Sequence, residues 1–319
     1  MTPRSPPSAA VERFTADLRA LLPGDGRMGL AVSGGPDSLA LLLLGATAFP
    51  GRVAAATVDH GLRPEAVDEA QFVATVCATL NVPHRILRVT VPPGASVQAQ
   101  ARAARYAALA GWAAEESLNA LLTAHHADDQ AETLLMRLTR GSGLGGLAGI
   151  RATSEIGGLV VARPLLGWRR DALRALVEEA GLRPVADPSN EDEAHDRVRM
   201  RRHLAEAAWL DPVALARSAS ALAEAEQALD WVVERLAAER VSGEGDALRL
   251  DPSDLPPELL RRLVLLCLRR IQPDAVPRGE QVTVLIATLL EGGTATLGTV
   301  LCRGGPHFRF ALAPRRRHG

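Results

Sequence analysis

The sequence predicts an α/β protein: a parallel sheet with helices on both faces, followed by a smaller, mostly helical C-terminal domain. Three observations predict this fold class. Short apolar, strand-like segments alternate with helix-like segments between residues 27 and 139, which is the pattern of a parallel sheet covered by helices. A chain of 319 residues is comfortable for two domains. Segments rich in Ala, Leu and Glu over about 212–240 indicate long helices.

The elements are expected in the following order. A helix over about 8–22 precedes the alternation. Strands are predicted at 27–33, 52–60, 84–91 and 117–125, and the helices that alternate with them at 36–46, 64–81, 96–116 and 127–139. A short strand (157–166) and a helix (168–180) follow the glycine-rich loop "GSGLGGLAG". We expect the first domain to span 1–205 and the second 206–319.

Composition excludes several classes of protein. The formal net charge of −1 gives no overall basic character, and the N-terminal segment has no apolar core typical of a signal peptide. No apolar run is long enough to cross a bilayer, so we expect a cytoplasmic protein with no membrane partner. Cys77, Cys267 and Cys302 form no CxxC pair, which disfavours zinc, iron–sulfur and dithiol sites. The oligomeric state stays open, a homodimer included.

The stretch "SGGPDS" (33–38) lies between a predicted strand and a predicted helix. It fits neither the Walker A spacing nor the dinucleotide fingerprint. Backbone N–H groups at a helix start, together with two serine hydroxyls, suit a phosphate or pyrophosphate. Asp37 would repel such an anion unless a cation such as Mg²⁺ bridges them. A plain Gly-Gly turn with Ser33 as the helix cap is the alternative.

Further polar clusters lie at other predicted strand ends and on one helix. "VDHGLR" (58–63) ends the second strand with His60 and Arg63. Arg102 and Arg105 share a helix face. Each of these has an ordinary explanation as a cap or a solvated charge. Because ligands of parallel sheets bind beyond the C-terminal strand ends, the position of "VDHGLR" supports a functional role as much as the ordinary explanation.

The densest polar cluster is "TAHHADDQAET" (123–133), where a strand end carries two histidines and a helix start carries acidic residues. Acidic residues in a first helical turn are partly explained by the helix dipole. Capping alone does not require so many. Asp129 and Glu132, three residues apart, can face one cavity with His125, where they could hold Mg²⁺ or deprotonate an amine.

At this point the sequence resembles a known group of enzymes. "SGGPDS" is similar to the loop of the N-type ATP pyrophosphatases, which cleave ATP between its α and β phosphates. "VDHGLR", "ARAARY", "AHHADDQAET", "RGSGLGGLAG", "RPLLGWRRDAL" and "DPSN…DRVRMRR" follow in the order found in the tRNA(Ile)-lysidine synthetase family. The resemblance covers residues 27–204. It implies an adenine nucleotide alpha hydrolase-like sheet, and it matches the C-terminal third only loosely, as a helical tRNA-binding domain.

The resemblance implies a two-step reaction. ATP adenylates C2 of cytidine 34 in a CAU-anticodon isoleucine tRNA, and the ε-amine of free L-lysine then displaces AMP. The residues implied to bind ATP are Ser33, Gly34, Gly35, Pro36, Asp37 and Ser38. Those implied to be catalytic are Asp37, Arg105, His125, Asp129 and Glu132, with Mg²⁺ on Asp37 and Asp129. Arg105 would offset charge developing at the α-phosphate.

Arginines are the expected tRNA contacts, since all 36 basic residues are arginine. The resemblance points to Arg197 or Arg201. Arg202 and the tail Arg315–Arg317 are candidates as parts of local arginine patches, and a solvated helix face is the favoured ordinary explanation of such arginines. Gln98 lies where relatives often carry glutamate.

Two enzyme alternatives and one non-enzyme alternative stay open from the sequence. A tRNA 2-thiolation enzyme on the same fold usually needs paired cysteines. A small-metabolite adenylating synthetase would use the loop without "AHHADDQAET". A nucleotide-sensing module would need no metal and base set, which Asp37, Asp129 and Glu132 would supply.

Overall fold

A computed structural model describes residues 3–61, 65–90, 97–184, 196–207, 209–275 and 277–314. Arg63, the segment 185–195 with "DPSN", and the arginines at 315–317 lie outside the described residues, as does the side chain of Gln98. The chain divides into two compact units, Met1–Ala223 and Glu224–Gly319. This division falls inside one long helix, and the functional boundary at 205/206 stays a prediction.

The N-terminal unit contains a six-stranded sheet in the order β3-β2-β1-β4-β6-β5. Its strands are β1 (Met28–Ala31), β2 (Val53–Asp59), β3 (His84–Arg88), β4 (Ala120–Leu122), β5 (Thr153–Ile156) and β6 (Leu159–Ala162). The first four strands and β6 run parallel, as predicted. The edge strand β5 pairs antiparallel with β6, so the sheet is mixed and the expected all-parallel sheet is wrong at this edge. Only a short turn at Gly157 and Gly158, both with positive φ, joins the two strands, and a parallel pair would need a longer crossover.

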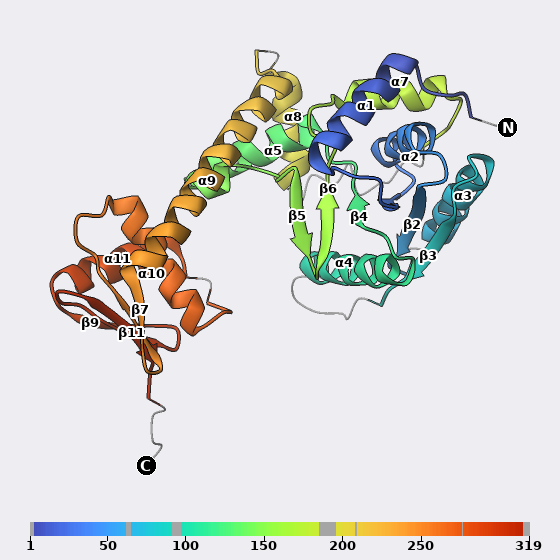
Figure 1. Cartoon of the computed structure of the whole chain (residues 1–319). Coiled ribbons are helices and arrows are strands. Elements are labelled where there is room, and N and C mark those ends of the chain that lie inside the picture. Colours follow the sequence, from blue (N-terminus) through green and yellow to red (C-terminus); the bar gives the residue numbers. More distant parts are fainter. Residues whose placement is uncertain are drawn as a thin grey trace. The chain divides into compact units, whose positions relative to one another are not determined.

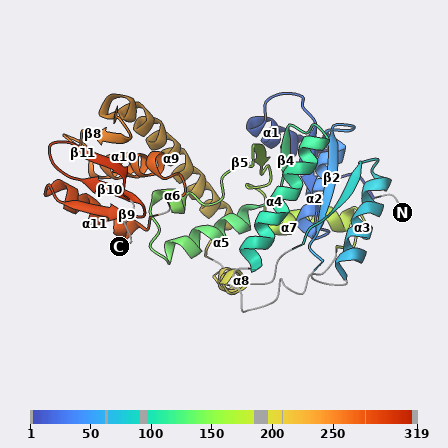
Figure 2. The ribbon, with the colours of Figure 1, turned by 90° about the horizontal axis from the view of Figure 1, so that it is seen from below.

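Helices cover both faces of this sheet, as predicted. The helices of the N-terminal unit are α1 (Ser8–Leu21), α2 (Pro36–Ala48), α3 (Glu65–Thr79), α4 (Val97–Glu115), α5 (Ala127–Leu138), α6 (Leu144–Leu147), α7 (Arg170–Glu179) and α8 (Asp196–Glu206). Figure 1 shows α1, α2 and α7 on one side of the sheet and α4 on the other, and Figure 2 views the sheet from the side of α4. The carboxyl ends of β1 and β4 therefore meet the starts of α2 and α5 at one edge.

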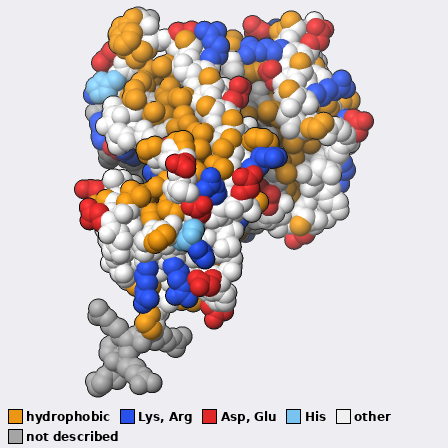
Figure 3. Space-filling model, turned by 60° about the vertical axis from the view of Figure 1, so that its left-hand side comes forward, with side chains coloured by type: hydrophobic (Ala, Val, Ile, Leu, Met, Phe, Trp, Pro, Cys, Tyr) orange, Lys and Arg blue, Asp and Glu red, His pale blue; other side chains and the backbone are white. Residues whose placement is uncertain are grey.

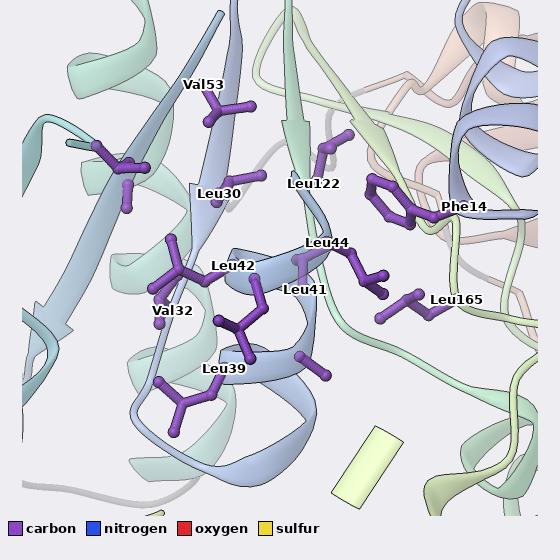
Figure 4. Close-up of a cluster of buried hydrophobic side chains, with 14 of the residues drawn as sticks. Phe14, Leu30, Val32, Leu39, Leu41, Leu42, Leu44, Val53, Leu122 and Leu165 are labelled. Atoms are coloured by element: carbon purple, nitrogen blue, oxygen red, sulfur yellow. The ribbon is translucent and has the colours of Figure 1, made fainter. Parts of the chain in front are cut away.

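The core explains the position of α2. Its run "LALLLL" is apolar on all sides, which is typical of a fully buried helix, and all six side chains are at most 1% exposed. In Figure 4, Leu39, Leu41, Leu42 and Leu44 pack among side chains of the central strands and of α1. Burying a leucine contributes about 1.5–3 kcal/mol, so this helix fixes the end of the phosphate loop firmly against the sheet.

The C-terminal unit is built on a sheet and is not mostly helical. A five-stranded antiparallel sheet has the order β7-β8-β11-β10-β9, with β7 (Val241–Glu244), β8 (Ala247–Leu250), β9 (Thr294–Leu297), β10 (Val300–Arg303) and β11 (Phe308–Leu312). Three helices accompany it: α9 (Pro212–Arg240), which begins in the first unit, α10 (Pro257–Ile271) and α11 (Gly279–Leu290). The expectation failed because these strands have only four or five residues and are joined by tight turns, some of them at Gly245 and Gly298 with positive φ.

Candidate active site

Two serines hold the predicted phosphate loop closed. The Ser33 amide donates to Ser38 Oγ at 3.1 Å, and Ser38 Oγ donates to the Gly35 carbonyl at 2.9 Å. Gly34 has φ of +91°, which favours glycine, and Pro36 occupies the first turn of α2, where its missing N–H costs nothing. The loop thus presents the start of a 13-residue helix, a geometry suited to a phosphate.

The two predicted motifs meet at His126. This side chain is 1% exposed and caps α5, with its Nδ1 accepting from the Asp129 amide at 3.3 Å. Its Nε2 lies 3.5 Å from Asp37 Oδ2 and 3.6 Å from Asp129 Oδ2. The carboxylate of the phosphate loop and that of the acidic helix therefore share one imidazole. Sequence reasoning named His125 and missed this role of its neighbour.

The pKa of His126 reflects this position. Burial alone lowers it, but the hydrogen bond to Asp37 and the negative charges of Asp129 and Asp37 outweigh burial, so the pKa is raised. Among the described residues, Asp37 Oδ1 is buried and has no hydrogen-bond partner. An unpartnered buried carboxylate oxygen is costly unless a ligand satisfies it. The site is therefore built to receive a donor or a cation beside Asp37.

Glu132 is fully buried at 1% exposure, and two arginines from distant segments hold it. Its Oε1 accepts from Arg170 Nη2 and from Arg201 Nε, both at 3.0 Å. Its Oε2 is buried and has no partner within the described chain. The carboxylate therefore ties α7 and α8 to α5, a role that the sequence did not indicate.

Arg170 is the largest omission of the sequence interpretation. Its guanidinium touches Glu132, lies 3.8 Å from Asp129 Oδ1 and has Nε 3.3 Å from His126 Nε2. Its amide donates to Asp128 Oδ2 at 2.8 Å, which fixes the start of α7. The signal was present in "RPLLGWRRDAL", but nothing in that stretch shows that α7 begins beside α5.

Asp128 shows how firmly the start of α7 is held. Burial raises its pKa, but the hydrogen bonds from the Arg170 amide and the Arg169 side chain outweigh burial, and the net pKa is lowered. The charged carboxylate is thus stabilised in place. Asp128 therefore holds the N-cap residue Arg169 and the Arg170 amide, and with them the start of α7, against α5.

His125 and Arg105 lie on the α4 side of the sheet edge. His125 Nδ1 is 2.9 Å from Thr123 Oγ1, and burial lowers its pKa to about 4, with the Arg163, Arg105 and Arg102 charges adding to the effect against Asp129. This histidine is therefore neutral near pH 7. Arg105 Cζ lies 5.2 Å from the Tyr106 ring centroid. The pKa of His60 is lowered by burial and, next, by the positive charge of Arg105. His60, at the end of β2, is therefore close to Arg105.

Two of the three arginines predicted to contact tRNA bind α5. Arg197 Nη2 donates to Thr133 Oγ1 at 3.1 Å, and Arg201 binds Glu132 as described. Arg202 has Nε 4.0 Å from Glu206 on its own helix. RNA contacts by these residues stay a prediction.

Comparison with known proteins gives a consistent result. A family model described as "PP-loop domain" matches residues 8–208. The chain is 48% identical over 312 residues to a protein of Zymomonas mobilis and 50% identical over 316 residues to one of Novosphingobium aromaticivorans. Both are named tRNA(Ile)-lysidine synthase, and the matches cover 95% and 97% of this chain and 94% and 96% of those proteins.

A solved structure shares the fold of about two thirds of the chain. The U34-tRNA thiolase NcsA from Methanococcus maripaludis, with its [4Fe-4S] cluster, matches with a TM-score of 0.56 at 18% identity, covering 68% of this chain and 80% of that one. Such low identity supports the fold alone. No helix among the described residues is long and apolar enough to cross a membrane.

Proposed function

The chain belongs to the tRNA(Ile)-lysidine synthase family of PP-loop enzymes, and from that premise we propose how it acts. The substrates are ATP, free L-lysine and the isoleucine tRNA with a CAU anticodon. In the first step the C2 oxygen of cytidine 34 attacks the α-phosphorus, and the bond to the leaving pyrophosphate breaks. In the second step the ε-amine attacks C2, the C2–O bond breaks, and AMP leaves.

The observation that carries this proposal is the meeting of Asp37 and Asp129 at one buried imidazole. It brings the phosphate loop within reach of the acidic helix, so a triphosphate on the loop would have its reacting end beside α5. The loop amides at the start of α2 would bind the leaving pyrophosphate. Asp129 would accept a proton from the incoming lysine ammonium or orient it.

The residues present fit a magnesium ion. Mg²⁺ in nucleotide sites is bound by one or two carboxylates together with substrate phosphates and water. The described residues contain no group of three or more His, Cys, Asp or Glu side chains that could hold a metal ion by themselves. A magnesium ion on a nucleotide needs only one or two carboxylates. Asp37, with its unpartnered Oδ1, and Asp129 would supply them. Bound there, the ion would neutralise phosphate charge.

The other predicted catalytic residues take distinct roles in this proposal. Arg105 would stabilise charge at the α-phosphate, since no carboxylate neutralises it among the described side chains. Neutral His125 would orient the substrate by hydrogen bonding and would not carry a charge. Glu132 would act through Arg170 and Arg201, which it holds.

A thiolation enzyme, the closest alternative on this fold, is disfavoured by the cysteines. Cys77, Cys267 and Cys302 are all buried, and burial raises the pKa of each to about 12. A thiol with such a pKa is not a nucleophile near neutral pH. Sulfur transfer through these residues therefore has no support.

The decisive experiment incubates the protein with ATP, labelled lysine and transcripts of the isoleucine tRNA. We expect lysine incorporation that requires C34 and is lost when C34 is replaced by U. Asp37→Ala should reduce the rate by about 10²–10³-fold, as for other groups that stabilise transition-state charge. Asp171→Ala, at a carboxylate that is 84% exposed on α7, is the control and should leave the rate unchanged. Pyrophosphate release without lysine transfer would overturn the assignment of the substrate.

A further inference from the structure

The sheet of the C-terminal unit has one face covered by helices and one face turned to solvent. Phe308 and Phe310 on β11, together with Val300 and Cys302 on β10, are fully buried against α10 and α11. Because side chains alternate across a strand, the residues next to them along each strand point to the opposite face. Arg303 and Arg309 occupy such positions, and both are exposed.

The strand register places three arginines in one row on this open face. Arg309 on β11 lies opposite Arg249 on β8 and, on its other side, opposite Arg303 on β10. All three are exposed. The row continues to Ser242 on β7 and Thr294 on β9, which are also exposed. Neighbouring strands are about 4.8 Å apart, so three positive charges lie within about 10 Å.

Such a row is unfavourable for the protein by itself. Like charges directly opposite one another on paired strands are destabilising. Glu244 neutralises one member, since its Oε2 lies 3.0 Å from Arg309 Nε. Arg249 and Arg303 form no ion pair with any residue that the structure describes. Two unneutralised arginines therefore flank a neutralised one.

We propose that this row, Arg249–Arg309–Arg303, binds the sugar–phosphate backbone of the tRNA substrate. Planar guanidinium groups bind phosphate through paired hydrogen bonds, and a polyanion converts the unfavourable row into a favourable contact. The hydroxyls of Ser242 and Thr294 extend the row with further donors to phosphate. The inference rests on the proposed function, because tRNA is the polyanion that function supplies.

The surrounding surface agrees with a phosphate contact and not with base reading. On the face drawn in Figure 3, basic side chains lie next to one another on the C-terminal unit close to the grey residues, with acidic side chains beside them. The next residues of the open face on β9, β10 and β11 are Thr296, Leu301 and Ala311. None of them is aromatic, so they offer no ring on which a base could stack. Contacts of this kind fix the position of an RNA without specifying its sequence.

The test measures tRNA binding by the full chain as a function of salt concentration. Each arginine–phosphate contact contributes about 1 to the slope of log K against log salt, so R249Q/R303Q should lower the slope by about 2. The control R269Q/R270Q removes the same charge from two exposed arginines on α10. It should leave the slope unchanged. ATP binding should be unaffected in both variants. The midpoint of thermal unfolding of R249Q/R303Q should not fall and should rise slightly, because the repulsion within the row is relieved.

The outcomes separate this inference from the proposed function. If the unmodified chain neither binds the tRNA nor transfers lysine to it, the proposed function fails. If the unmodified chain does both and R249Q/R303Q binds with an unchanged slope, only the arginine row is overturned. Binding of an acidic protein segment by the row, with tRNA binding undiminished, would overturn it in the same way. Equal losses in the two double variants would show a general charge effect and would also refute it.

Discussion

Glu132→Gln tests whether this carboxylate acts on the substrate or holds the arginines. The substitution removes a buried negative charge that accepts from two guanidinium groups at 3.0 Å. Removing one partner of a buried ion pair costs about 3–5 kcal/mol. The remaining glutamine would leave Arg170, with a side chain only 18% exposed, beside Asp129 alone at 3.8 Å. We therefore expect a large loss of stability.

The size of this loss can be expressed as a melting temperature. For a domain of 150–250 residues, 1 kcal/mol corresponds to about 2–4 °C, so Glu132→Gln should lower the midpoint of the N-terminal unit by about 6–20 °C. Arg201→Ala removes only one of the two bonds, from a side chain that is 35% exposed, and should cost about 1 kcal/mol. Circular dichroism during heating measures both, with exposed Glu179→Gln as the control.

A double-mutant cycle completes the test. In the Glu132→Gln background, Arg201→Ala should cost almost nothing, because its partner is already lost. Lysine transfer by Glu132→Gln should fall because less of the protein is folded and because Arg170 loses its contact with Glu132. A Glu132→Gln protein that melts like the unmodified chain but transfers no lysine would refute this reasoning and would place the carboxylate on the substrate.

Two further predictions concern titration and sulfur. Burial lowers the pKa of His125 in the folded protein to about 4, from the ordinary 6.5. As pH falls, the unfolded chain therefore takes up the proton first. The free energy of unfolding should decrease by up to about 3 kcal/mol between about pH 6.5 and pH 4. His125→Asn should remove that part of the pH dependence in denaturant titrations, and an unchanged profile would contradict the buried neutral state. The three cysteines, buried and with pKa values of about 12, should resist thiol reagents in the folded protein, and a variant with all three replaced by alanine should keep lysine transfer. Loss of transfer in that variant, with the fold intact by circular dichroism, would revive the thiolation alternative.

The features that sequence predicted are those encoded by neighbouring residues. "SGGPDS" carries its own strand end, glycine turn and helix start, so the loop and α2 follow from one stretch of chain. The same holds for the acidic start of α5, where Asp128 and Asp129 lie in the first helical turn. The parallel pairing of the strands β1 to β4 follows from the alternation of strands and helices.

The features that sequence missed depend on residues far apart in the chain. Arg170 and Arg201 reach Glu132 across 38 and 69 residues, and no local pattern indicates those distances. The C-terminal sheet pairs β8 with β11 across α10 and α11. Its strands are short enough that the longer helical periodicity between them dominated the prediction.

The arginines show why burial and pairing decide function where residue counts do not. Sequence reasoning assigned RNA contacts to Arg197 and Arg201, both of which use their guanidinium groups on α5. Any phosphate they bind must compete with Thr133 or with a buried carboxylate. Arg249 and Arg303 face no such competition among the described residues. A phosphate contact with Arg249 or Arg303 should therefore be more favourable than one with Arg197 or Arg201, because it breaks no existing hydrogen bond. A salt-dependent slope that falls more in R249Q/R303Q than in R197Q/R201Q would support that ranking, and the reverse order would refute it.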